Sequence, residues 1–220
     1  MKRTILAAIM VFIVMALTGC GDGSSAPTTI VTQILSDQAF DGDIEKDLAG
    51  LFTVTQGMSQ TVQSVFAGID PATEAEFRAF LDFPLTGFGG VPGNAIILSA
   101  FLDFKINSIL PQPLIGTIPI RIDLVSFQPP TLIGTDFDRT TQPALATTTI
   151  IPPISQADFG NHVSVDVTLL MKEAQRLGLL NFQIRIMEDL GVVSPGLIEI
   201  IDTTGVNRGV HAPLLEVTYF

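Results

Sequence analysis

The sequence predicts an all-β fold, a jelly-roll-like β-sandwich with one short crossover helix. Apolar and polar residues alternate along most of the chain, which is the period of a strand with one buried face. Glycines and prolines interrupt these stretches at short intervals, as expected for loops between strands. One stretch, 168–179, has the period of a helix instead. Many strands and one helix indicate a sandwich with a helical crossover.

The clearest strands lie at 77–85 and 96–107, and each has a continuous apolar face. These faces consist of Phe77, Ala79, Leu81, Phe83 and Leu85, and of Ile96, Leu98, Ala100, Leu102, Phe104 and Ile106. The glycine-rich segment 86–93 lies between them, so we expect the two strands to pair as a hairpin. Phe80 and Phe101 lie on the opposite faces, which are either covered by other elements or exposed to a partner.

Further strands are expected near 32–40, 52–56, 61–67, 117–127, 145–150, 163–167, 181–188, 196–201 and 213–219. The predicted helix has an apolar stripe formed by Leu169, Leu170, Ala174 and Leu177. Asp166 or Thr168 can cap its start, and Gly178 can end it.

The charge balance limits the class of partner. The 220 residues include 11 Lys and Arg against 22 Asp and Glu, a net charge of −11. Residues 1–19 contain Lys2 and Arg3 and no acid, so 11 − 2 = 9 basic residues remain after them and the net charge becomes −13. Such a surface repels phosphate backbones, so we expect no nucleic-acid partner. It also disfavours adhesion to anionic lipid, so attachment to a membrane would need a lipid anchor.

Leu17-Thr18-Gly19-Cys20 follows a short apolar run and contains the chain's only cysteine. The run at 5–17 is about 13 residues long, the length of a signal-peptide core and shorter than the roughly 20 residues of a spanning helix. The motif resembles the lipobox of bacterial lipoproteins. The resemblance implies a signal peptide at 1–19, acyl chains such as palmitate on Cys20, and a membrane anchor. The alternative is a secretory signal whose cysteine later forms a disulfide, but the sequence has no second cysteine.

Residues 20–30 are small and polar and predict a flexible tether, followed by a single β-sandwich domain at 31–220. Gly21 follows the cysteine directly. The aspartate that resembles an inner-membrane retention signal is one position later, at Asp22. We therefore expect a lipid-anchored location in the cell envelope, at the outer membrane rather than the inner membrane.

Several short segments, spread over most of 36–220, occur in a recognisable order. They are 76–83, 91–95, 98–102, 165–168 and 213–219. Their order resembles the DNRLRE-type domains, which are related to the family 96 carbohydrate-binding modules. The resemblance implies a jelly-roll-like sandwich. Such domains usually have a tryptophan in the helix region, and this chain has none. A shared fold does not by itself imply sugar binding.

Four acids alternate at the start of the domain: Asp41, Asp43, Glu45 and Asp47. In an extended segment they project to one side and can collect a hard cation, so a structural calcium ion is one interpretation. The other interpretation is a solvated acidic face. The spacing is not that of an EF-hand loop. No other cofactor is expected.

A second polar segment consists of Asp136, Phe137, Asp138 and Arg139. One interpretation is a turn with a local ion pair. The other is a binding loop in which Phe137 is an exposed anchor, because loops on rigid sandwiches often carry function.

Catalytic signatures are weak. His162 and His211 are isolated, and Glu188 and Asp189 suit a turn after a strand. We therefore expect a non-catalytic binding or scaffolding protein whose partner is another envelope protein. The alternative is a tethered module that binds a polysaccharide or other polymer, which one tyrosine and no tryptophan disfavour. A hydrolase is the third possibility.

Overall fold

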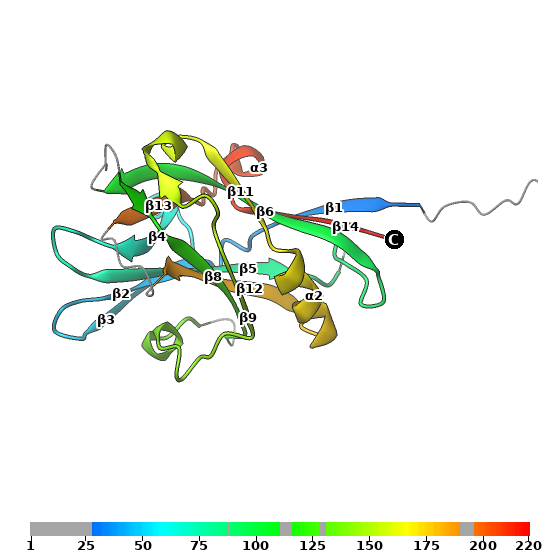
Figure 1. Cartoon of the computed structure of the whole chain (residues 1–220), viewed down its shortest axis with the longest axis horizontal. Coiled ribbons are helices and arrows are strands. Elements are labelled where there is room, and N and C mark those ends of the chain that lie inside the picture. The colour runs from blue at the N-terminus through cyan, green and yellow to red at the C-terminus, as the bar shows by residue number, and fades with distance from the viewer. Residues whose placement is uncertain (1–27, 88, 111–115, 128–130, 190–195) are drawn as a thin grey trace, which may run out of the picture.

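Strands make up most of the regular structure of the computed structural model, which describes residues 28–87, 89–110, 116–127, 131–189 and 196–220 (Figure 1). The strands are β1 (Ile30–Leu35), β2 (Gly42–Lys46), β3 (Phe52–Gln56), β4 (Ser64–Ile69), β5 (Glu76–Pro84), β6 (Ile97–Leu110), β7 (Thr117–Ile118), β8 (Ile120–Val125), β9 (Ala146–Thr149), β10 (Ile154–Ser155), β11 (His162–Asp166), β12 (Asn181–Glu188), β13 (Leu197–Ile201) and β14 (Leu214–Tyr219). The helices are α2 (Thr168–Arg176) and the single turn α3 (Arg208–His211), with 3-10 turns η1 (Gly134–Phe137) and η2 (Gln156–Asp158). The prediction of an all-β fold is confirmed.

The strands form one curled antiparallel sheet, with only β7 and β10 forming a separate pair among the described strands. From β6 the sheet runs through β13, β4, β5, β12 and β8 to β9. β14 and β1 extend it from β6, β11 also pairs with β6, and β2 and β3 branch from β5. In Figure 1, β6, β11 and β13 lie in the upper part of the molecule, and β12, β8 and β9 lie in the lower part. The curl therefore places β11, which borders β6, and β9, at one end of the path, in different layers.

The predicted hairpin between 77–85 and 96–107 is wrong. Both segments are strands, but β5 pairs with β2, β4 and β12, whereas β6 pairs with β11, β13 and β14. The connection at 85–96 therefore carries the chain from one part of the sheet to another. Alternation identifies the buried face of a strand but does not identify its neighbour, because both strands can bury the same face against a common core.

Helix α2 is the predicted crossover, since it connects β11, which pairs with β6, to β12, which pairs with β5 and β8. It buries Leu170, Met171 and Ala174, while Leu169 of the predicted stripe is 78% exposed. Gly178 has a φ of +66° just after the helix. This left-handed conformation favours glycine at a helix end, in agreement with the predicted stop.

Two apolar clusters stabilise the sheet. The larger one fills the space between the layers and includes Leu81, Phe83, Leu102 and Phe104. The smaller one lies on the opposite face of β5 and consists of Ile44, Phe80, Val125, Phe127, Leu132 and Phe137. Phe80 is thus covered, whereas its counterpart in β6, Phe101, is 40% exposed. The covered alternative therefore holds for Phe80, whereas Phe101 is partly exposed and a partner at its face stays a prediction.

The residues that carry the predicted membrane anchor lie at the start of the chain. The expected signal peptide at 1–19, Cys20 and the tether up to residue 27 lie outside the described residues. Residue 30, expected in the tether, is the first residue of β1, which pairs with β14. No helix in the described part of the chain is long and apolar enough to span a membrane.

Candidate functional site

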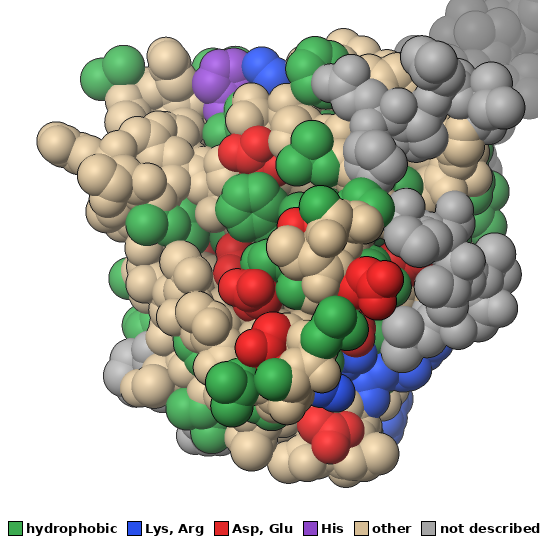
Figure 2. Space-filling model, turned by 90° about the vertical axis from the view of Figure 1, so that its left-hand side faces the viewer, with side chains coloured by type: hydrophobic (Ala, Val, Ile, Leu, Met, Phe, Trp, Pro, Cys, Tyr) green, Lys and Arg blue, Asp and Glu red, His purple; other side chains and the backbone are tan. Residues whose placement is uncertain are grey.

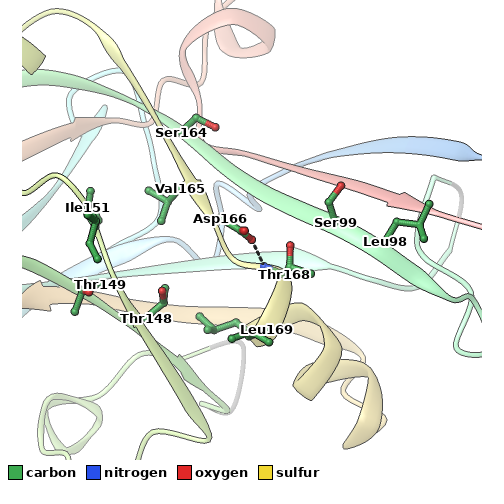
Figure 3. A pocket seen from close by; sticks show the side chains of 12 residues that line it. Leu98, Ser99, Thr148, Thr149, Ile151, Ser164, Val165, Asp166, Thr168 and Leu169 are labelled. Atoms are coloured by element: carbon green, nitrogen blue, oxygen red, sulfur yellow. Dashed lines mark hydrogen bonds between the residues drawn. The ribbon is translucent and has the colours of Figure 1, made fainter.

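A groove of about 560 Å³ lies between two edges of the curled sheet, β9 and β11 (Figure 3). Strand β9 and the two residues after it line one side, and β11 lines the other. The start of α2 and of β6 complete the lining. The lining residues are Leu98, Ser99, Thr148, Thr149, Ile150, Ile151, Ser164, Val165, Asp166, Thr168, Leu169 and Leu170. This volume is within the range of about 300–1,000 Å³ that is usual for ligand sites.

The connection from β11 to α2 fixes the polar groups at one end of the groove. The backbone N–H of Thr168 donates to Oδ1 of Asp166 at 2.9 Å, drawn as the dashed line in Figure 3. The Thr168 Oγ1 accepts a hydrogen bond from the Ala100 backbone N–H at 2.9 Å, which ties the helix start to β6. The hydroxyl and backbone amide of Thr168 lower the pKa of Asp166. Asp166 is therefore a fixed negative charge at neutral pH.

Three exposed aliphatic side chains surround these polar groups. Ile151 is 85% exposed, Leu169 78% and Leu98 44%. Hydroxyl groups of Ser99, Thr148, Thr149 and Ser164 lie among them, and Figure 3 shows the labelled side chains distributed around the space between β9 and β11. The lining thus combines apolar surface with hydrogen-bonding groups and a single carboxylate, and it contains no aromatic ring. Such a lining suits a ligand that is itself partly apolar and rich in hydrogen-bonding groups.

The four acids considered as calcium ligands separate into different environments. Oδ1 of Asp41 accepts from the Asp82 backbone N–H, and Oδ1 of Asp47 accepts from the Leu51 N–H in a turn. Asp43 and Glu45 line a pocket of about 320 Å³, where Oδ2 of Asp43 accepts from a backbone N–H. No group of three or more His, Cys, Asp or Glu side chains suited to a metal ion occurs in the described segments. A calcium ion there stays a prediction.

The pKa values of two of these acids, Asp41 and Asp43, are raised strongly. Burial raises the pKa of Asp43 to about 7; the hydrogen bond from the Phe66 N–H opposes the rise, and the charge of Glu45 adds to it. Burial, followed by the charge of Asp202 and a hydrogen bond with it, raises the pKa of Asp41 well above its usual range. Both Asp41 and Asp202 are fully buried, and Asp202 also pairs with Arg208 at 2.7 Å, so the two neighbouring carboxyls disfavour each other's ionisation. The pair of Asp41 and Asp202 connects the segment after β1 to the residue after β13, so its role is structural.

The predicted loop 136–139 packs over the smaller apolar cluster. Oδ2 of Asp136 accepts from the Ile133 N–H at 2.9 Å, and Asp138 accepts from the Thr140 N–H at 2.8 Å. Phe137 is only 4% exposed and lies 3.9 Å below the guanidinium of Arg78, so it is a core residue and not an exposed anchor. Arg139 pairs at 3.2 Å with a distant carboxylate, that of Asp123, instead of with the acids beside it.

Most of the basic residues that the structure describes gather around this loop. Asp123 is fully buried and also binds Arg121 and Arg185 at 2.8 Å each. Burial would raise the pKa of Asp123, but these arginines outweigh it and the pKa is lowered. The loop 136–139 borders a pocket of about 340 Å³, which is lined by Lys46, Phe52, Glu76, Arg78, Phe137, Asp138 and Arg139. Figure 2 shows acidic side chains spread over one face of the molecule, with basic ones gathered mainly at its lower right.

The remaining candidates are surface or strand-end residues. His162 begins β11 and its Nδ1 lies 2.6 Å from Oδ1 of Asp103, while His211 ends α3. The backbone N–H of Asp189 donates to the carbonyl of Pro119, just after β12. His162 at a strand end and Asp189 after a strand fit an edge and a turn position, whereas His211 lies in a helical turn and Glu188 is the fully buried last residue of β12.

Sequence reasoning did not single out most residues of the groove. The signal was present in Thr147-Thr148-Thr149, three small β-formers without a charge, followed directly by two isoleucines and two prolines. No protein-family model matches this chain, and no curated protein matches it. The assignment of a function therefore depends on the groove and on the motif around Cys20.

Proposed function

We propose that this protein is a lipid-anchored binding protein of the bacterial cell envelope, and that the groove between β9 and β11 holds its partner, another envelope protein. The observation that carries the proposal is the groove itself, where Ile151, Leu169 and Leu98 are exposed beside hydroxyl groups and Asp166. Exposed aliphatic side chains around a hollow are typical of interaction sites. The lipobox-like motif supplies the proposed attachment through Cys20.

The low pKa of Asp166, the groove's carboxylate, favours a binding role over a catalytic one. A general base works best when its pKa is near the working pH. The pKa of Asp166 is lowered by its hydrogen bonds from Thr168, which makes it a poor proton acceptor but a good partner for a cation or an N–H donor. The protein is proposed to have no cofactor.

A polymer-binding module is the second candidate function. Its support is the hydroxyl-rich lining, with Ser99, Thr148, Thr149 and Ser164 available to a sugar chain. Sugar sites usually present flat aromatic faces. The groove's lining contains none, so we rank a protein partner first.

The anchor is tested by replacing Cys20 with serine in cells that express the full chain. We expect the wild-type protein in the membrane fraction and the Cys20→Ser protein in the soluble fraction, because the acyl chains would supply the attachment. Equal membrane retention of both proteins would refute the anchor.

The groove is tested by placing a photo-crosslinking amino acid at Leu169 or Ile151 in the native envelope. The matched control position is Val206, an apolar residue that is fully exposed and outside the groove. We expect a discrete crosslinked protein from the two groove positions, identified by mass spectrometry, and none from Val206. The same products from all three positions, or no product from the groove, would contradict the proposal.

A further inference from the structure

Both sides of the groove are edges of the sheet. Among the described strands, β9 pairs only with β8 and β11 pairs only with β6. In an antiparallel pair, alternate residues bond to the neighbouring strand, and the residues between them direct their N–H and C=O groups the opposite way. The side of each strand that faces away from its partner therefore carries a row of unpaired donors and acceptors.

On β9 the alternation places the unpaired N–H and C=O groups at Thr149. The Ile150 N–H donates to the Ile120 carbonyl at 2.9 Å, and Ile122 lies opposite Thr148. The inward-bonding residues are thus Ile150 and Thr148. The N–H and C=O of Thr149 point away from β8, and Thr149 lines the groove.

On β11 the same reasoning selects two further groove residues. The Val167 N–H donates to the Ala100 carbonyl at 2.9 Å, which sets Val167 and Val165 as the residues that bond to β6. Ser164 and Asp166 lie between them in the alternation and direct their backbone groups away from β6. Both line the groove. Figure 3 shows Ser164 and Asp166 on one side of the space and Thr149 on the other.

The edge of β9 is short, four residues, but carries no charged or proline guard against strand pairing. Proteins commonly protect edges with very short strands, lysines, prolines, bulges or inward-pointing charges, or cover them with a helix or loop. Ala146–Thr149 contains neither a charge nor a proline, and its pairing with β8 has a regular register. An open edge of this kind is a template for another strand.

We propose that an extended segment of a partner polypeptide binds in the groove as an added β-strand. It hydrogen-bonds to the edge of β9 or β11 through its backbone and places a basic side chain near Asp166. The inference rests on the proposed function and specifies the occupant of the same groove. A peptide has N–H and C=O groups at the two-residue repeat of the edges, roughly 6.8 Å, and a sugar chain does not.

Proline substitution tests the backbone contacts directly. Thr149→Pro and Ser164→Pro each remove one outward N–H that no sheet bond uses, and prolines are tolerated at such edge positions. Thr149→Val and Ser164→Ala are the matched controls, since they remove the hydroxyl but keep the N–H. Circular dichroism of the four variants checks that each one folds.

The probe is a phage-displayed library of random ten-residue peptides, selected against the full chain in detergent micelles. We expect enriched peptides with alternating apolar residues and at least one Lys or Arg. Their affinity should fall at least tenfold with one or both proline variants and change less than threefold with the controls. Methylation of alternate backbone nitrogens of the peptide should also abolish binding.

Amide hydrogen exchange on the wild-type protein gives a readout that needs no variant. Bound peptide should protect the amides of Thr149, Ser164 or Asp166, which are outward-pointing, in preference to Thr148 and Val165. No enriched peptide, binding unaffected by both prolines, or no added protection overturns the inference. So does a dimer of this chain that the prolines abolish, or an oligosaccharide that binds equally to all variants. Crosslinking from Leu169 can still succeed in those cases, so the proposed function and this inference fail separately.

Discussion

Replacing Asp43 with asparagine should stabilise the protein at alkaline pH. Asp43 is 4% exposed, and burial raises its pKa to about 7 from the ordinary 3.8. The folded state therefore holds a proton that the unfolded state releases. An acid with a raised pKa contributes stability below about pH 4, and this contribution is lost as the pH rises to about 7. The difference corresponds to about 4 kcal/mol at 1.36 kcal/mol per pKa unit.

Asparagine is uncharged at every pH, and its carbonyl can still accept the hydrogen bond from the Phe66 N–H. We expect Asp43→Asn to equal the wild type near pH 4 and to exceed it at pH 8 by up to about 4 kcal/mol in the free energy of unfolding. Urea denaturation of the full chain, followed by circular dichroism between pH 4 and pH 8, measures this difference. The buried pair of Asp41 and Asp202 is present in both proteins, so its own pH dependence cancels.

The control has to separate burial from net charge, because removing any acid from so acidic a chain relieves repulsion. Asp138→Asn makes the same change of charge at an exposed carboxylate whose pKa is lowered by hydrogen bonds from the backbone and side chain of Thr140. It should not stabilise the protein at pH 8. If Asp43→Asn gains no more than Asp138→Asn, or if its gain is the same at pH 4 and pH 8, the reasoning about burial is refuted.

Two further predictions concern stability and use the same denaturation assay. Phe80→Ala should cost about 3–5 kcal/mol because the ring is fully buried in the smaller cluster, whereas Phe101→Ala should cost less than about 1 kcal/mol at its 40% exposed position; equal losses would show that the face of β5 is not covered. Asp123→Ala should cost about 3–5 kcal/mol because it leaves the fully buried Arg185 without its carboxylate partner. The double variant with Arg185→Met should recover part of this loss, and no recovery would contradict the assigned pairing.

The fold class could be read from the sequence because alternation and turn residues act locally. The strands β12 and β13 and the helix start at Thr168 lie within one residue of their predicted positions. β2 was missed as a strand, since its short sequence GDIEK has too few β-branched residues to resemble one. Strand pairing was not predictable, because the partners of β5 and β6 come from distant parts of the chain.

The predicted sites depended on residue type, and residue type alone misjudged their environment. Acids in alternation suggested either a cation site or a solvated acidic face at 41–47; the cation site stays a prediction, but the acids do not form one solvated face, because Asp41 lies beside the distant Asp202 and Asp43 is buried and accepts from the Phe66 N–H. Phe137 was considered as an exposed anchor, and the packing of its ring under Arg78 shows that it is buried. The environment of each group is set by elements that are not its neighbours in sequence, and a single sequence gives no sign of them.

The groove illustrates the opposite case, a site built from residues with no chemical signature. Threonines and serines are common in strands, and Ile151 and Leu169 would be assigned to the core from their type. They become a candidate site only because β9 and β11 are two edges of one curled sheet and α2 crosses beside them. A closed barrel would have paired these edges and buried these side chains. The open seam leaves both edges unpaired, and a strand supplied by a partner would complete the hydrogen bonding that the strands described in the structure do not provide.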